Sequence, residues 1–437
     1  MSTYLIITVA IVCLLLYIVF FVNFVFTILS LLAIRATIGP LRNISISFLG
    51  LNLNLLGVFS LLVCILSISY LIVKKTKFKN SFFTLYIIFC FWCLISIFYS
   101  IDKHISIADF FRIFSPIMFY ILILNEIKEN RHINLLILIV ILSSLIPVFY
   151  GFYQFVTHTG FVRHGIMRIN STFMFPNSFG FYLSLISLIT LNQISLERQK
   201  QMKVFLFSIL ALNVICLILT GTRTAFIGFL IGLVTYIFLS PKKKYMLYIF
   251  LLIYLVLLTQ PQIKERIFQP IKSLSVLQKK TYPITIKSNL PKKKELWEMN
   301  TWEWRIYYWK YVWQTFTKKP ILGYGIGTSK LAIYQNIHRK ALIPHNDYLR
   351  LLVEVGIIGF SLYIISFGFL IFDFIRFFVR ASEHKYRAYY TLVIAVTVCF
   401  LTIMVADNII LSNTFLWYFF SIVAVSYNIR KIELGLV

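Results

Sequence analysis

Residues 4–34 read YLIITVAIVCLLLYIVFFVNFVFTILSLLAI and contain no charged side chain. A helix crosses a bilayer with about 20 apolar residues, so this run suffices for one tilted helix or two short ones. Eleven further apolar runs follow, at about 46–73, 81–100, 110–125, 134–155, 173–195, 204–220, 224–239, 245–260, 347–373, 387–406 and 410–428. The runs are continuous, whereas strands of a membrane barrel alternate in segments of about ten residues. We therefore predict an all-α polytopic membrane protein with about 12 transmembrane helices, within a range of about 11–14.

The composition supports this fold class. Of 437 residues, 59% are hydrophobic and 13% are charged, and the mean hydropathy is +0.85. A soluble domain carries roughly 25% charged residues, so an ordinary soluble protein is excluded. The net charge is +27, and only part of it is the usual excess of Lys and Arg in cytoplasmic loops. We expect membrane lipids and an anionic substrate as the partners of this charge, and no nucleic acid.

Lys and Arg concentrate in alternate connections between the apolar runs, which predicts an orientation in the membrane. If each run crosses once, one side carries Lys74, Lys75, Lys77, Lys79, Lys128, Arg131, Arg198, Lys200, Lys203, Lys242, Lys243, Lys244, Arg376, Arg380, Lys385, Arg387, Arg430 and Lys431. We predict that this side is cytoplasmic, that both termini lie there, and that the protein resides in the cytoplasmic (inner) cell membrane. The first run exceeds the 7–15 apolar residues of a cleavable signal, so we expect it to be retained.

The runs divide the chain into three parts. Residues 1–260 are predicted to form an N-terminal bundle of about nine spans, and residues 347–437 to add about three more. Residues 261–346 then form a long extracytoplasmic loop with 16 Lys and Arg against 4 Glu, a net charge of +12. Long loops escape the positive-inside rule, so the orientation stands. A loop of this charge predicts an anionic partner on the outer side.

An aromatic segment lies within this loop. Residues 296–316 read LWEMNTWEWRIYYWKYVWQTF, in which one helical face would carry Trp302, Ile306, Trp309, Trp313 and Phe316. This stripe predicts a helix lying in the outer membrane interface, and a plain membrane anchor explains it by itself. Arg305 lies off the stripe. A guanidinium suits bidentate contact with phosphate, but the sequence pattern leaves the role of Arg305 open.

Two further arginines fall on the same predicted outer face. Arg223 is the only charged residue in Leu219-Thr-Gly-Thr-Arg-Thr-Ala-Phe226, a tight connection between two apolar runs. Lys and Arg are scarce in short outer turns, which favours a functional role over a turn that happens to carry Arg. Arg168 precedes the polar segment Asn170–Asn177 and adds a cation to this face.

The segment around His345 joins the long loop to the next span. Histidine is the side chain suited to proton transfer near neutral pH, although a single His is also compatible with a structural role. Asn346, Arg350 and Glu354 follow at four-residue intervals on one helical ridge, where Arg350 and Glu354 can pair. Charged residues within a span usually face the bundle interior and mark a site. The Gly-rich Gly323–Thr328 is a weak match to a phosphate loop, and a plain turn is the alternative.

The candidate residues gather at one membrane face. Transporters place their substrate sites near the midplane between repeats, and channels need polar rings along a pore. Neither pattern is present in the sequence. A polysaccharide-unit flippase stays open as an alternative from another functional class, and it would require charges along a central cavity.

These motifs together resemble the O-antigen ligase/polymerase superfamily of bacterial membrane glycosyltransferases. The resemblance covers about residues 92–360. It rests on Tyr99-Ser-Ile-Asp102 with Arg112, on Arg168 to Asn177, on Gly221-Thr-Arg-Thr-Ala225, on Arg305 with Trp309, on Pro320-Ile-Leu-Gly-Tyr-Gly-Ile-Gly327, and on His345-Asn-Asp-Tyr-Leu349 with Glu354-Val-Gly-Ile-Ile-Gly359. The tract at 279–294, rich in Lys and Pro, has no counterpart in the family pattern.

The resemblance implies an enzyme that moves a glycan from an undecaprenyl-pyrophosphate carrier to an acceptor sugar hydroxyl, with no metal or other cofactor and with inversion. It implies His345 as the catalytic residue, either the base or the group that orients the acceptor hydroxyl. It implies Arg223 and Arg305 as pyrophosphate ligands, and Arg168 as a weaker ligand. Asn346, Arg350 and Glu354 are supporting candidates. We expect a polymerase of lipid-linked repeat units, with a ligase to lipid A-core or another acceptor as the alternative. A flippase and a chain-length regulator are candidate protein partners.

Overall fold

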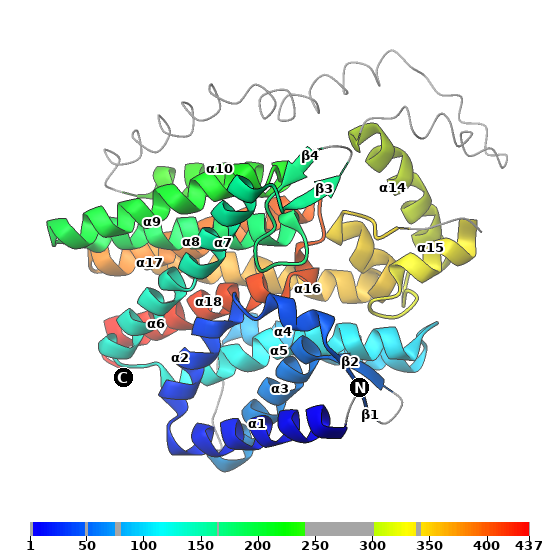
Figure 1. The fold of residues 1–437 in the computed structure, drawn as a ribbon, viewed down its shortest axis with the longest axis horizontal. Helices are drawn as coiled ribbons and strands as arrows, with labels where there is room; N and C mark the ends of the chain where they lie inside the picture. Colours follow the sequence, from blue (N-terminus) through cyan, green and yellow to red (C-terminus); the bar gives the residue numbers. More distant parts are fainter. Residues whose placement is uncertain are drawn as a thin grey trace.

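The computed structural model describes residues 3–48, 51–74, 80–163, 166–240, 301–337 and 342–436. Helices dominate these ranges (Figure 1). Eight of the described helices are long and apolar enough to cross a membrane, and three shorter apolar helices accompany them. The polytopic helical fold is therefore confirmed within the described ranges. The number of 12 spans stays a prediction, because the run at 245–260 and the tract at 279–294 lie outside the described residues.

The helices have the following bounds: α1 (Thr3–Val22), α2 (Phe24–Arg35), α3 (Leu55–Lys74), α4 (Ser81–Phe98), α5 (Lys103–Glu126), α6 (Asn130–Leu142), α7 (Leu145–Thr157), α8 (Pro176–Leu196), α9 (Lys200–Leu219), α10 (Arg223–Leu239), α14 (Thr301–Lys318), α15 (Ser329–Ile337), α16 (Asp347–Val379), α17 (His384–Met404) and α18 (Asn413–Glu433), with the short 3-10 helices η1 (Gly39–Asn43) and η2 (Ile409–Leu411). Two antiparallel strand pairs complete the fold, β1 (Ser45–Phe48) with β2 (Leu51–Asn54) and β3 (Phe161–Arg163) with β4 (Ile166–Arg168).

The first apolar run forms two helices that meet at Asn23. The Asn23 side chain caps α2 by accepting a hydrogen bond from the Phe26 amide at 2.9 Å, which lets the chain reverse inside an apolar sequence. Tyr17 donates to Ser69 at 3.4 Å, and the ring of Phe20 contacts that of Tyr70. The C-terminal end of α1 therefore lies beside the C-terminal end of α3.

This reversal changes the placement of the termini. Tyr70 donates to Glu126 at 2.5 Å, and Asn428 donates to the Ile127 carbonyl at 3.0 Å, so the C-terminal ends of α3, α5 and α18 share one end of the bundle. A 20-residue helix is about 30 Å long, so α1 begins at the opposite end (Figure 1). The sequence argument for two cytoplasmic termini assumed a single pass for the first run, and the side of the membrane on which each terminus lies stays a prediction.

The second apolar run also begins differently from the prediction. Residues 45–54 form the β1–β2 hairpin, and α3 starts only at Leu55. Ser45, Ser47, Asn52 and Asn54 alternate with apolar residues, which is the period of a strand. The hairpin lies at the same end of the bundle as the start of α5 (Figure 1).

Three of the predicted basic connections lie together in space. Lys385 lies 3.5 Å from the side-chain oxygen of Asn130, and the charge of Lys128 acts on Lys431. The connections at 128–131, 380–387 and 430–431 therefore lie at one end of the bundle, which we call the basic end. The opposite end holds the starts of α10 and α16, and we call it the site end.

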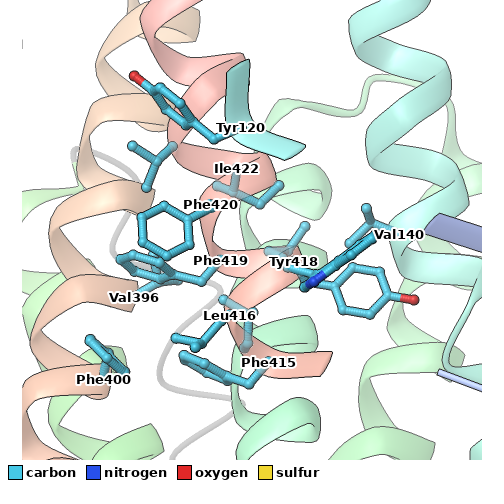
Figure 2. Close-up of a cluster of buried hydrophobic side chains, with 14 of the residues drawn as sticks. Tyr120, Val140, Val396, Phe400, Phe415, Leu416, Tyr418, Phe419, Phe420 and Ile422 are labelled. Carbon is cyan, nitrogen blue, oxygen red and sulfur yellow. The ribbon is translucent and has the colours of Figure 1, made fainter. Parts of the chain in front are cut away.

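The core centres on α18, whose apolar residues occur on every side. Phe415, Trp417, Tyr418, Phe419 and Phe420 are all fully buried (Figure 2). A helix that is apolar all round belongs inside a bundle. Lipid tails are as apolar as these side chains, so their close packing, rather than removal from water, holds the helices together. The Trp417 ring stacks on Phe119 with centroids 4.5 Å apart, and such pairs contribute roughly 0.5–1.5 kcal/mol.

A break in α16 positions the site. Gly356 has φ 66°, and the helix is interrupted there, which frees the carbonyl groups of the preceding turn. The amides of Tyr324 and Gly325 donate to Val353 and Glu354 at 2.9 and 2.8 Å, and the Trp92 indole donates to Val355 at 3.0 Å. The Gly-rich loop and α4 are thereby tied to the first part of α16.

Candidate functional site

His345 and Asp407 form the centre of the site end. His345 lies two residues before the start of α16 and has φ 50°, while Asp407 lies between α17 and α18. The imidazole Nδ1 is 3.3 Å from Asp407 Oδ1 and 3.4 Å from the Asn408 amide nitrogen. The carboxylate gives the stronger, charge-assisted bond, so we assign the proton to Nδ1. Nε2 is then the nitrogen that can accept a proton.

Asp407 is itself held by two polar side chains from other helices. Its Oδ2 accepts hydrogen bonds from Asn177 at 2.6 Å and from Thr224 at 3.0 Å. Only 4% of Asp407 is exposed. Burial alone would raise its pKa, but the hydrogen bond and charge of His345 and the charge of Arg305 lower the pKa below its usual value. The carboxylate is therefore kept ionised beside the imidazole.

The three principal sequence-predicted residues converge around Asp407. Arg223 is the first residue of α10 and directly precedes Thr224, which bonds Asp407. Arg305 lies on α14, and its charge reaches Asp407. Both arginines are half-buried. Their roles as pyrophosphate ligands stay predictions.

Arg168 is hydrogen-bonded to the turn that precedes Arg223. Its guanidinium donates to the Thr220 carbonyl at 2.6 Å, to Thr222 at 2.9 Å and to Asn177 at 3.0 Å. Asn177 in turn bonds Asp407. Arg168 therefore orders the groups that hold Asp407, whereas the sequence predicted a weaker pyrophosphate ligand; that second role stays a prediction.

Arg350 is the centre of a buried ionic cluster. It donates to Glu354 at 2.9 Å, as the four-residue spacing predicts, and to Asp109 at 2.7 Å, and it lies 3.6 Å from Asp347. Arg112 also donates to Asp109. Only 2% of Arg350 and none of Glu354 is exposed. A buried cation with several carboxylates fixes the packing of α5 on α16, because loss of one partner leaves a buried charge unpaired.

Asn346 and Asp347 order the start of α16 in different ways. The Asn346 side chain caps α16 by accepting from the Leu349 amide at 3.0 Å. Asp347 accepts from the Ile410 amide at 2.9 Å. The Asp347 bond therefore joins the start of α16 to the segment that follows Asp407. Asn346 thus has a local capping role, which its position before the span could have indicated.

The Gly-rich segment is a packing loop. The amides of Tyr324, Gly325 and Ile326 are occupied by protein acceptors, the last by Ser96 at 3.1 Å. A Cβ on Gly327 would lie 2.7 Å from that of Asp109. These glycines permit close approach of chain segments, so the weak match to a phosphate loop has no support in this geometry.

Helix α14 is buried along only part of the predicted stripe. Phe316 of that stripe is buried with Tyr308 and Val312 against α15 and α16, whereas Trp313 is 50% exposed. Trp309 donates to the Pro344 carbonyl at 2.8 Å, one residue before His345. The placement of the stripe in the membrane interface stays a prediction.

Asp407 is the main residue that the sequence prediction missed. Asp407 is a lone acid between two apolar runs, and such an acid is a signal for a site. Its partner His345 lies 62 positions earlier in the chain, so no local sequence pattern indicated that the two residues are in contact. Among the described residues, no three His, Cys, Asp or Glu side chains are arranged to hold a metal ion.

Comparison with known proteins gives consistent matches. The family model described as O-antigen ligase matches residues 206–364. A protein of Rickettsia typhi named "Putative polysaccharide ligase" is 24% identical over 375 residues, covering 78% of this chain and 83% of the relative. A protein with the same descriptive name from Rickettsia felis is 25% identical, covering 69% of this chain and 70% of the relative. Another from Rickettsia prowazekii is 22% identical, covering 83% of this chain and 88% of the relative. The resemblance to the O-antigen ligase/polymerase superfamily is therefore confirmed.

Proposed function

We propose that this relative of the O-antigen ligases is a membrane glycosyltransferase that moves a glycan from an undecaprenyl-pyrophosphate carrier to an acceptor hydroxyl. The observation that carries the proposal is the His345–Asp407 pair, in which a buried carboxylate orients an imidazole at the site end. We place this end on the extracytoplasmic face of the cytoplasmic membrane, because the basic connections lie at the other end.

In the proposed reaction His345 Nε2 accepts the proton of the acceptor hydroxyl. The hydroxyl oxygen forms a bond to the anomeric carbon, and the bond from that carbon to the pyrophosphate oxygen breaks. The leaving pyrophosphate keeps the electron pair. Attack from the face opposite the leaving group inverts the anomeric configuration. Asp407 stabilises the imidazolium that forms, in the way a buried carboxylate does in other acid–base pairs.

Arg223 and Arg305 are proposed to bind the pyrophosphate. Two guanidiniums oppose the negative charge that grows on the leaving group, and charge-assisted bonds to phosphate are strong. The half-buried position of both residues, near Asp407, supports this role. Arg168 would act indirectly through Thr222 and Asn177.

Two versions of the proposed function differ in the acceptor of the glycan. The family description and the names of the relatives favour a ligase, which attaches the finished glycan to lipid A-core or another acceptor. The polymerase predicted from the sequence would extend a second lipid-linked repeat unit with the same chemistry. In that case a flippase would act before the polymerase, and a chain-length regulator would act together with it.

Deletion of the gene followed by complementation tests the proposal. Surface glycan and lipid-linked oligosaccharides are separated on gels. Loss of a ligase leaves long chains on the lipid carrier, loss of a polymerase leaves single units, and loss of a flippase leaves neither outside the cell. We expect His345→Ala and Arg223→Ala to reproduce the deletion while the protein still inserts in the membrane. Normal surface glycan in both variants would overturn the site assignment.

A further inference from the structure

A cavity of about 620 Å³ is lined by residues of α5, α15 and the start of α16, near His345 and Asp407 in the chain. It is bordered by Ile343, two positions before His345, and by Leu411, four positions after Asp407. The proposed glycosyl transfer assigns no substrate to this cavity. Its volume falls within the roughly 300–1,000 Å³ that small-molecule sites occupy.

The polar groups in the wall are largely occupied by one another. Asp109 and Glu354 accept hydrogen bonds from Arg350, and Ser329 donates its amide to Glu354 at 3.3 Å. All four of these residues are buried. Their carboxylates are therefore poorly available for the hydroxyl groups of a sugar.

The accessible part of the wall is apolar. Ile105 is 40% exposed and Tyr334 is 51% exposed, and Leu331, Ile343 and Leu411 are partly exposed. A surface of this kind fits an aliphatic or isoprenoid chain better than a saccharide.

Two cationic side chains lie next to this apolar wall. Arg112 and Lys330 line the cavity, and Lys330 is exposed. Arg112 is paired with Asp109, whereas Lys330 forms no ion pair with a carboxylate in the part of the chain that the structure describes. Two cations on the wall of one cavity favour an anion there.

We propose that this cavity is a second lipid site, which takes a phosphate group beside Arg112 and Lys330 and an apolar chain against Ile105, Leu331 and Tyr334. The shared chemistry is a phosphate on an apolar chain, which a membrane phospholipid or a polyprenyl phosphate supplies. The site is separate from Arg223 and Arg305, so it does not depend on the proposed glycosyl transfer. A polyprenyl ligand would place the carrier of a lipid-linked acceptor beside His345.

Native mass spectrometry of the full-length protein in detergent tests this site. The probes are phosphatidylglycerol, undecaprenyl phosphate, phosphatidylcholine and inorganic phosphate, each titrated separately. We expect an anionic lipid to bind and the phosphatidylcholine and inorganic phosphate to bind at least about tenfold more weakly. The anionic lipid that binds more tightly identifies the source. Equal binding of phosphatidylcholine would overturn the role of the cations, and equal binding of inorganic phosphate would overturn the role of the apolar wall.

Two kinds of variant locate the binding. Lys330→Gln removes the unpaired cation of the cavity wall, and Leu331→Trp fills the cavity. Each should weaken anionic lipid binding by about tenfold or more, which corresponds to about 1.4 kcal/mol. Lys318→Gln, on the exposed side of α14, is the matched control. Unchanged binding in both cavity variants refutes the site.

A third variant separates this inference from the proposed function. His345→Ala should abolish glycan transfer and leave lipid binding at the cavity intact. Loss of cavity binding in His345→Ala would show that the lipid sits in the catalytic site, which would also overturn the inference.

Discussion

The Asp407 carboxylate lies 3.3 Å from the His345 imidazole, although the two residues belong to different connections and are separated by 62 positions. Asn177 and Thr224 fix the second carboxylate oxygen. Three separate parts of the chain therefore determine the orientation of one histidine. The first prediction follows from this relationship.

Asp407→Asn should keep the shape of the side chain and remove its charge. We expect transfer in membranes or proteoliposomes to fall by about 10²–10⁴-fold, because the imidazole loses both its tautomer preference and the stabilisation of its charged form. The control is Asp373→Asn, a carboxylate near the basic end that bonds Tyr427. Full activity of Asp407→Asn would show that His345 does not depend on this carboxylate.

The stability of the protein should depend on pH through Asp407. Its folded pKa lies below the usual value of about 3.9, so its contribution is complete above that pH and is lost as the pH falls through the folded pKa. Thermal unfolding of wild type and Asp407→Asn is compared at pH 7 and at steps below pH 4. The stability advantage of wild type should shrink at the lowest pH. A constant difference between the two proteins contradicts this assignment.

Arg350→Met should be strongly destabilising. It leaves the carboxylates of Asp109, Asp347 and Glu354 buried without their cation, and breaking a buried ion pair in this way costs about 3–5 kcal/mol. Thermal unfolding measures the loss, and Arg376→Met, an exposed residue of the same helix, is the control. Adding Glu354→Gln to Arg350→Met should recover part of the stability, because one uncompensated charge is removed.

Gly356→Ala tests the break in α16. An added Cβ would lie 2.0 Å from the Ile321 carbonyl oxygen, and φ is 66°. Gly435 is a matched control, since its φ is 65° and an added Cβ meets nothing within 4 Å. Gly356 also has ψ −173°, a backbone conformation that is essentially restricted to glycine, so the thermal unfolding temperature should fall much further for Gly356→Ala. Equal shifts would show that the clash is relieved without cost.

Arg168→Lys should lower both stability and activity. An ammonium cannot replace the three bonds from one planar guanidinium to Thr220, Thr222 and Asn177. Charged hydrogen bonds contribute about 1.5–3 kcal/mol each, so a loss of this order is expected in thermal unfolding. Arg198→Lys, which is exposed at the basic end, should change neither property. A variant with normal stability but no transfer would instead indicate direct contact with substrate.

The amino-acid sequence by itself determined the features that depend on local interactions. Continuous apolar runs predicted the helices, because insertion in a bilayer depends on the composition of each segment. The four-residue spacing predicted the Arg350–Glu354 pair, and the distribution of Lys and Arg predicted which connections share the basic end.

Only the tertiary structure decided how distant segments meet. It divided residues 4–34 into two helices at Asn23, turned the Tyr308 face of α14 inward, and brought Asp407 to His345 and Asp109 to Arg350, 241 positions apart. The physical reason is that the apolar composition of a segment specifies whether it enters the membrane. Lipid and protein interiors are equally apolar, so this composition does not specify which helices pack together. Partner choice between helices therefore rests on shape and on buried polar contacts, which a single sequence does not display.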